Sequence, residues 1–131
     1  MTNKTNNPSL DIVGIGNAIV DVLTTADDSL LERLAIKKGS MTLIDENKAE
    51  ELYEMTTNIT QRSGGSVANS LACVAQLGGK AAFIGRVRND KLGEIFTEEI
   101  STTGTIFKTP ASSVGPSTAR CVIFITPDAQ R

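Results

Sequence analysis

The chain has 131 residues, of which 40% are hydrophobic and 21% are charged, with a formal net charge of −2 and no histidine. This length and composition predict one soluble globular domain and exclude a disordered chain. The weak negative charge offers no basic surface to nucleic acid, and the lack of histidine excludes histidine-based triads and histidine-ligated zinc sites.

The amino terminus reads MTNKTNNPSL, a polar stretch without the apolar segment of a secretion signal. We expect residues 1–9 to form a flexible tail. No run of 18 consecutive apolar residues occurs, so the sequence predicts no membrane span and no membrane partner. A cytoplasmic location is the expectation that follows.

The segment LDIVGIGNAIVDVLTT predicts a strand over 10–15, a tight glycine turn, and a second strand over 18–24. A short helix follows and ends before Gly39. An apolar strand is then expected over 40–44, and Asp45 is placed to cap the next helix.

From Ser66 onward, Val67, Leu71 and Val74 recur at helical spacing, and the AAFI segment after this helix predicts a buried strand. Asp90 then caps another helix. The alternation over 59–104 predicts a parallel α/β unit, which places the chain in the α/β class. The strands at 18–24, 40–44 and 118–126 have no packing helices of their own and could form a separate small sheet.

Two nucleotide motifs can be set aside. The GIGNAI segment lacks the third glycine of a dinucleotide-binding turn and continues as an extended chain, and no GxxxxGK[ST] phosphate loop occurs. Any ATP would have to be held in another way.

Asp21 is an acidic residue inside an otherwise apolar strand. Its carboxylate must either face water on an edge strand or receive hydrogen bonds, because burial without partners is costly. In the second case its oxygens could accept hydrogen bonds from vicinal sugar hydroxyls. The position alone favours the first interpretation, an aspartate on an edge strand that faces water.

Gly64 and Gly65 stand directly before a helix. Without Cβ atoms they let the backbone approach a ligand, and the free N–H groups of the helix start point into the same space. Asn69 follows one turn later on the same helix face, where its amide could donate and accept hydrogen bonds. A plain glycine turn with a solvated asparagine explains the pattern equally well.

Arg86 and Arg88 lie at a strand-to-helix junction near Asp90. Arginines in such loops are usually solvated or paired with nearby acids, so we interpret both as structural. Asp90 is explained by its role as a helix cap.

Three segments together, GNAIVD, GGSVANSLACVAQLG and AAFIGRVRNDKLG, resemble the amino-terminal half of the ribokinase (PfkB) family of carbohydrate and nucleoside kinases. The segments GNAIVDV and KGSMTLID are most similar to the adenosine-kinase-like branch. The resemblance covers residues 10–131 and implies the amino-terminal part of a ribokinase-like three-layer α/β core with a small β-sheet lid.

The resemblance also implies site residues. It places Asp21 on the sugar hydroxyls of the acceptor, and it assigns further substrate-binding positions to Asn17, Met41, Gly64, Gly65, Asn69, Arg120 and Val122.

The family's catalytic aspartate lies in a glycine-rich motif far toward the carboxyl end, which we expect beyond residue 131. The resemblance therefore implies an ATP-dependent kinase acting on a hydroxyl of adenosine or of a related nucleoside or sugar. ATP and Mg²⁺ are expected for the complete enzyme and none for this chain alone. The alternatives are an inactive sugar- or nucleoside-binding fragment, a ribose- or fructose-type sugar kinase, and a fragment that pairs with a second copy through its lid strands.

Overall fold

The structure is a computed structural model that describes residues 9–128, so the expected tail lies outside the described residues except for its last position. Ten elements follow one another along the chain: β1 (Ile12–Ile15), β2 (Ile19–Thr25), α1 (Asp28–Arg33), α2 (Glu46–Glu54), β3 (Thr60–Gly64), α3 (Ser66–Gln76), β4 (Ala81–Ile84), α4 (Lys91–Thr102), β5 (Ile106–Phe107) and β6 (Ala119–Ile125). None of the helices in 9–128 is long and apolar enough to cross a membrane.

The first sheet is parallel and has the strand order β1-β4-β5. Gly14 pairs in register with Phe83, which pairs with Phe107, so these three residues share one face of the sheet. Helix α3 packs directly on this face, because a Cβ on Gly14 would lie 2.6 Å from a methyl group of Val67. Helix α4 packs on the same face through Phe96, whose ring centroid is 5.6 Å from that of Phe83.

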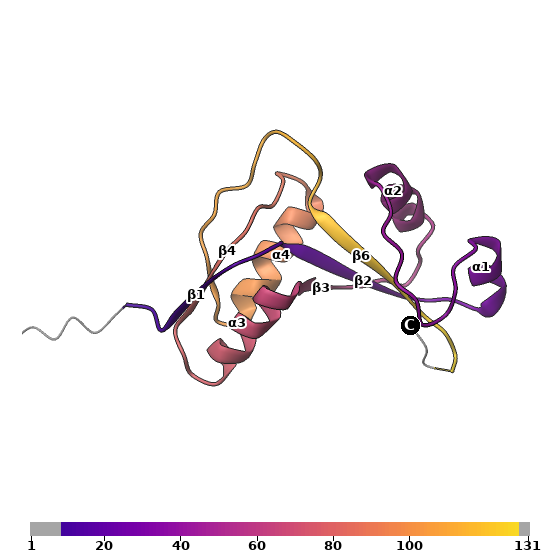
Figure 1. The fold of residues 1–131 in the computed structure, drawn as a ribbon. Helices are drawn as coiled ribbons and strands as arrows, with labels where there is room; N and C mark the ends of the chain where they lie inside the picture. The colour runs from indigo at the N-terminus through magenta and orange to yellow at the C-terminus, as the bar shows by residue number, and fades with distance from the viewer. Residues whose placement is uncertain (1–8, 129–131) are drawn as a thin grey trace, which may run out of the picture.

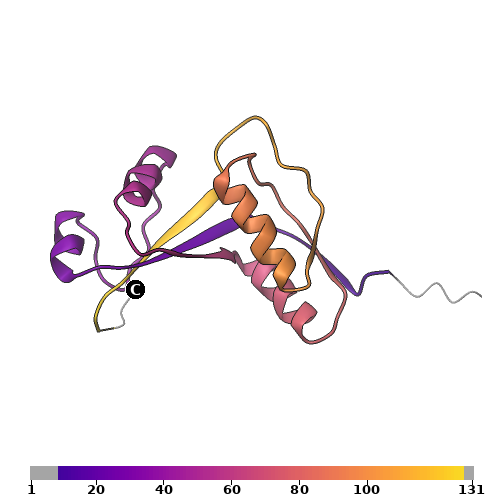
Figure 2. The same ribbon diagram turned by 180° about the vertical axis from the view of Figure 1, so that it is seen from behind.

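The second sheet, which we call the lid sheet, has the order β3-β2-β6. Strand β2 is central and pairs antiparallel with β3 and parallel with β6. Figures 1 and 2 show β2 and β6 running side by side away from α3 and α4, with α1 and α2 beside their far ends. The predicted strands at 18–24 and 118–126 correspond to β2 and β6.

Two expectations about strands were wrong. Residues 40–44 form no strand, and the third strand of the lid sheet is β3. The alternation over 59–104 predicted that the segment before α3 would join the parallel unit, whereas β3 pairs antiparallel with β2. A segment forms a strand only where a neighbouring strand pairs with its backbone N–H and C=O groups. The polar segment β3 pairs in this way with β2, whereas the apolar segment 40–44 has no such neighbour.

The core is continuous between the two sheets. Val20 and Val22 on one face of β2 are fully buried and belong to the same cluster as Phe83, Phe96 and Ile100. Helix α4 contacts β2, β3 and β5 and therefore packs against both sheets. This shared packing fixes the end of the lid sheet that lies beside α3.

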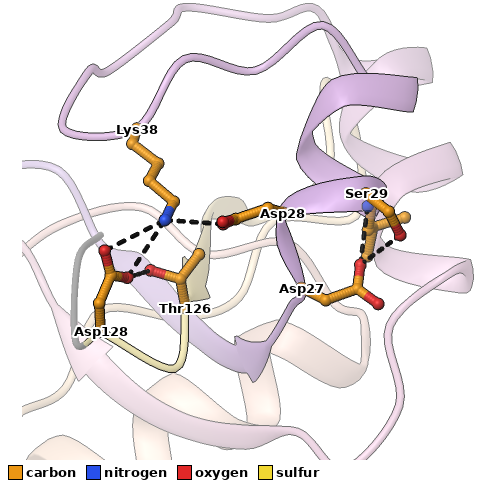
Figure 3. Close-up of polar contacts among 7 residues, drawn as sticks. Asp27, Asp28, Ser29, Lys38, Thr126 and Asp128 are labelled. Atoms are coloured by element: carbon orange, nitrogen blue, oxygen red, sulfur yellow. Dashed lines mark hydrogen bonds and ion pairs between the residues drawn. The ribbon is translucent and has the colours of Figure 1, made fainter.

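Polar contacts hold the far end of the lid sheet (Figure 3). The Lys38 ammonium lies 2.7 Å from Asp28 at the start of α1 and 3.1 Å from Asp128 in the turn after β6. The Thr126 hydroxyl also donates to Asp128. Hydrogen bonds from Lys38 to Asp28 and Asp128 raise the pKa of the Lys38 ammonium. These contacts tie the loop after α1 to the end of β6.

Candidate functional site

Asp21 lies against Gly64. A Cβ on Gly64 would be 2.5 Å from one carboxylate oxygen of Asp21, so the acid occupies the space that any other residue at position 64 would fill. Strand β2 is the central strand of the lid sheet, which rules out the interpretation of Asp21 as an acid on an edge strand. The side chain is half-buried and makes no hydrogen bond or ion pair within residues 9–128.

Burial raises the pKa of Asp21 above its ordinary value of 3.8. The cause is loss of hydration without compensating donors, since a hydrogen bond to the charged form would lower the pKa instead. Across the strands, Cys121 is the register partner of Asp21 on β6. Burial first, and then the charge of Asp21, raise the pKa of the Cys121 thiol, which keeps it neutral at pH 7.

Helix α3 begins beside this carboxylate. Its N-cap residue is Gly65, with φ at 100°, and no side chain caps the helix. A Cβ on Gly65 would lie 2.7 Å from the carbonyl oxygen of Asn17, so glycine is required both for the backbone conformation and for the close approach of the β1–β2 turn. The first N–H groups of α3 are thus left for another acceptor.

Asn69 stands one turn into α3. Its backbone N–H donates to the Gly65 carbonyl at 2.9 Å, and its side chain is exposed without a hydrogen bond inside the described part of the chain. The structure therefore brings Asp21, Gly64 and Gly65 together with the Asn17 turn, and it leaves the Asn69 amide available on the same helix start. We call these five residues the acceptor corner.

An open hollow of about 370 Å³ has Asn17 in its lining, but not Asp21, Gly64, Gly65 or Asn69. Its other lining residues are Ala18, Ile19, Arg86, Pro116, Ser117 and Ala119. Ile19 and Ala119 are register partners on β2 and β6 and share a sheet face with Asp21. They lie two residues along the strands from it, about 7 Å.

Three expected site residues are not part of this corner. Arg120 and Val122 pair with Val20 and Val22, so they face the opposite side of the lid sheet from Asp21. Met41 lies in the segment between α1 and α2 and is 85% exposed, without packing against the sheet.

Arg120 has a structural environment on the opposite side of the sheet. Its side chain is 7% exposed, forms an ion pair with Glu50 at 2.6 Å, and lies over the ring of Tyr53 at 5.2 Å. The Tyr53 hydroxyl accepts a hydrogen bond from Gln61 on β3. These contacts attach α2 to the face of the lid sheet opposite Asp21.

On β6 the face of Asp21 carries Ala119, Cys121, Ile123 and Ile125, and the sequence analysis selected none of them. The alternation of side chains along a strand could have identified them, but only with the register between β2 and β6 known. A shift of one residue in that register exchanges Arg120 and Val122 for Cys121 and Ile123.

Arg86 and Arg88 have the structural role that the sequence indicated. Arg86 donates to the carbonyls of Val114 and Pro116 at 2.7 and 2.9 Å, and Arg88 donates to that of Gly115 at 2.6 Å. Both arginines thereby hold the segment that leads into β6.

Asp90 caps α4, as expected. Its carboxylate accepts hydrogen bonds from the Gly93 N–H at 2.8 Å, the Thr118 N–H at 2.9 Å and the Thr118 hydroxyl at 2.7 Å. Burial alone would raise the pKa of Asp90, but the hydrogen bonds from Thr118 and Gly93 outweigh it, and the pKa lies below its ordinary value.

Comparison with known proteins shows which families and structures this chain resembles. The sequence pattern of the pfkB family carbohydrate kinases matches residues 33–131. Adenosine kinase 2 of Arabidopsis thaliana is 26% identical over 98 residues, which are 71% of this chain and 28% of that protein.

Two solved structures share the fold. Adenosine kinase from Sinorhizobium meliloti is 46% identical with a TM-score of 0.79, over 94% of this chain and 38% of its own. A probable sugar kinase from Rhizobium etli CFN 42 is 43% identical with a TM-score of 0.80, over 93% of this chain and 37% of its own.

The chain thus spans less than two fifths of each of these relatives, and within that span its mixed α/β architecture with two small sheets matches the kinase structures. The expectation of a ribokinase-like α/β fold is confirmed for this part of it. The chain belongs to the pfkB family of carbohydrate kinases.

Proposed function

We propose that this chain is the acceptor-binding part of an ATP-dependent kinase that phosphorylates a hydroxyl of adenosine or of a related nucleoside or sugar. The observation that carries the proposal is the half-buried carboxylate of Asp21, which has no donor within residues 9–128 and lies against Gly64 at the uncapped start of α3. Membership of the pfkB family supports the reaction class.

The acceptor corner offers the groups that a polyol needs. A carboxylate only accepts hydrogen bonds, so its two oxygens can take the protons of two adjacent hydroxyls. The bare backbone at Gly64 and Gly65 lets a sugar ring come close, and the Asn69 amide can donate to or accept from a further hydroxyl. Hydrogen bonds to a charged acceptor are worth about 1.5–3 kcal/mol each.

Such binding would contribute to catalysis by orientation. Holding an acceptor hydroxyl in line with a phosphoryl group can lower the barrier by about 7–11 kcal/mol. Asp21 is on the central strand of the lid sheet and Gly65 is the N-cap of α3, and both elements contribute residues to one packed core, so the backbone at these positions is held in place before a ligand binds.

ATP and Mg²⁺ are implied for the whole enzyme by the family. Within residues 9–128 no group of three or more carboxylate, thiol or imidazole side chains could hold a metal ion. We therefore assign neither ATP nor Mg²⁺ to a residue of this chain, and we propose that the chain alone binds the acceptor with negligible turnover. The acceptor's aromatic base, if it has one, would lie on the face that carries Cys121 and Ile123.

Calorimetric titration of the 131-residue chain with adenosine, ribose and fructose tests the proposal. One of the three should bind, and Asp21→Asn should weaken that binding by about tenfold or more, because one strong acceptor is lost. Asp11→Asn is the control, since Asp11 is an exposed carboxylate just before β1, outside the lid sheet, and its hydrogen bond from the Lys80 N–H can also be accepted by an amide oxygen. Absence of binding by all three ligands, or equal affinity in both variants, would contradict the proposal.

A phosphorylation assay with ATP, Mg²⁺ and the ligand that binds tests the second part. The chain alone should give no phosphorylated product above background. Sustained turnover would show that the catalytic groups lie within these 131 residues and would refute the assignment as an acceptor-binding part.

A further inference from the structure

The strand beside Asp21 carries an arginine that could pair with it. Arg62 on β3 is the register partner of Asp21 on β2. Residues opposite each other in an antiparallel pair point to the same face, with their Cβ atoms about 4.5–5.5 Å apart, and opposite charges at such positions attract each other. The register of β2 and β3 therefore favours an ion pair between Arg62 and Asp21.

The structure shows a different partner for this arginine. One guanidinium nitrogen of Arg62 lies 3.1 and 3.2 Å from the two carboxylate oxygens of Glu99 on α4. Within residues 9–128, β3 is an edge strand of the lid sheet, so the Arg62 side chain can pass around this edge to α4, which packs on the face opposite Asp21. The Asp21 carboxylate lies over Gly64, two residues further along β3. The two opposite charges of the register pair thus form no ion pair with each other.

The electrostatics of Asp21 agree with this arrangement. Burial raises the pKa of Asp21, and no positive charge offsets that effect. A cation within about 4–6 Å would favour the charged form of the carboxyl group and lower its pKa instead. The other register partner of Asp21, Cys121 on β6, is a neutral thiol at pH 7 because its pKa is raised. Arg62 is therefore the register partner whose charge can decide whether the Asp21 carboxylate is free.

We propose that Glu99 is a positioning residue, which holds the Arg62 guanidinium away from Asp21 and thereby keeps the Asp21 carboxylate free for the acceptor. This inference rests on the proposed function, because it concerns the same carboxylate. Arg62 and an acceptor hydroxyl both donate hydrogen bonds, so they compete for the same two oxygens. The side chains of Arg62 and Glu99 are 64% and 28% exposed, so salt weakens the ion pair between them. Release of Arg62 inhibits acceptor binding from within the chain.

The pKa of Asp21 in the ligand-free 131-residue chain, measured by carbon NMR, tests the inference. Glu99→Ala releases Arg62, and the pKa of Asp21 should fall relative to wild type because the guanidinium then pairs with the charged form. Glu98→Ala is the matched control, since it removes a carboxylate from the adjacent, exposed position of α4, and it should leave this pKa unchanged. The double variant Glu99→Ala/Arg62→Ala should restore the wild-type value. An unchanged pKa in Glu99→Ala, or a fall that persists in the double variant, would overturn the inference.

Calorimetric titration of the same variants with the ligand that binds gives a second readout. Glu99→Ala should weaken binding by about two- to fivefold, the size of an exposed ion pair, and the double variant should regain the wild-type affinity. Equal affinity in Glu99→Ala and wild type would overturn the inference, and circular dichroism verifies that each variant is folded. If adenosine, ribose and fructose all fail to bind, the proposed function is contradicted, whereas the pKa comparison, which needs no ligand, still decides whether Glu99 restrains Arg62.

Discussion

Two helix starts in this molecule have opposite arrangements around an aspartate. At the start of α4, Asp90 accepts three hydrogen bonds from Gly93 and Thr118, and its pKa is lowered. At the start of α3, the N-cap is a glycine, and the neighbouring Asp21 has no donor within residues 9–128 and a raised pKa. The first carboxylate stabilises the fold, and we propose that the second accepts hydrogen bonds from a ligand.

The difference arises from where each carboxylate is attached. Asp90 belongs to the turn that it caps, so its own helix start supplies one donor, and Thr118, just before β6, supplies two. Asp21 comes from the neighbouring strand β2 and reaches α3 only through the space above Gly64. A fold that left Asp90 unsatisfied would lose stability, whereas one that satisfied Asp21 internally would lose the binding that we propose for it.

Removal of the satisfied carboxylate should have the largest effect on stability. Asp90→Ala removes the cap of α4 and leaves the Thr118 N–H and hydroxyl without their acceptor. We expect the free energy of unfolding to fall by about 3–4 kcal/mol, from the sum of a lost cap and lost hydrogen bonds to a charge. Urea denaturation measures it. Asp21→Ala removes no hydrogen bond within residues 9–128 and should cost less. If the two variants lower the free energy of unfolding equally, the contrast between the two sites is wrong.

The glycine at the start of α3 should be nearly as important. Gly65→Ala combines a left-handed backbone conformation with a contact between the new Cβ and the Asn17 carbonyl, and we expect a loss of about 2–3 kcal/mol. Gly78→Ala is the control, because Gly78 has φ at 93° but open space around its Cα, and should cost about 1–2 kcal/mol. Equal losses would show that the Asn17 contact is unimportant.

A methyl group at position 64 should act on binding more than on folding. In Gly64→Ala the new Cβ would occupy the space of the Asp21 carboxylate, so the carboxylate would have to move. We expect ligand affinity to fall by about tenfold, equivalent to about 1.4 kcal/mol, in the same calorimetric titration. Unchanged affinity would mean that the position of Asp21 against Gly64 is irrelevant to the ligand.

The pH dependence of stability should have opposite signs at the two sites. Asp21 has a raised pKa, so its contribution to stability is complete below its ordinary pKa of 3.8 and is lost as the pH rises through the raised value. Asp90 has a lowered pKa, so its contribution is present above 3.8 and is lost as the pH falls through the lowered value.

Denaturation curves between pH 3 and 6 for the wild-type chain, Asp21→Asn and Asp90→Asn measure these two contributions separately. Asp21→Asn should gain stability relative to wild type as the pH rises, and Asp90→Asn should lose less stability than wild type as the pH falls. Parallel curves for all three would refute the assignment of the two shifts.

Sequence reasoning predicted the elements whose signals are local. Helix α4 followed from the Asp90 cap and apolar spacing, and the acceptor corner followed from an acid in an apolar strand and two glycines before a helix. The strand expected at 40–44 failed because Met41 and Leu43 have no strand partner and remain exposed. Strand β3, with the sequence TQRSG, has no apolar alternation and exists because β2 pairs with it.

The positions expected on β6 lie on the other face of the sheet from Asp21 for a related reason. Family resemblance assigned Arg120 and Val122, but the face that a residue occupies depends on the register between strands about a hundred residues apart in the chain. No local pattern carries that register. The sequence therefore predicted that Asp21 and the two glycines lie together, and the structure shows which residues share the sheet face of Asp21.

The central claim is tested most directly by the pKa of Asp21 itself. A pH titration monitored by carbon NMR of its carboxyl group measures this pKa. In the free chain the pKa should lie above its ordinary value of 3.8. With adenosine, ribose or fructose bound it should fall, because ligand hydroxyls donate to the charged form. A pKa at or below the ordinary value in the free chain, or one that none of these ligands moves at saturating concentration, would contradict the account.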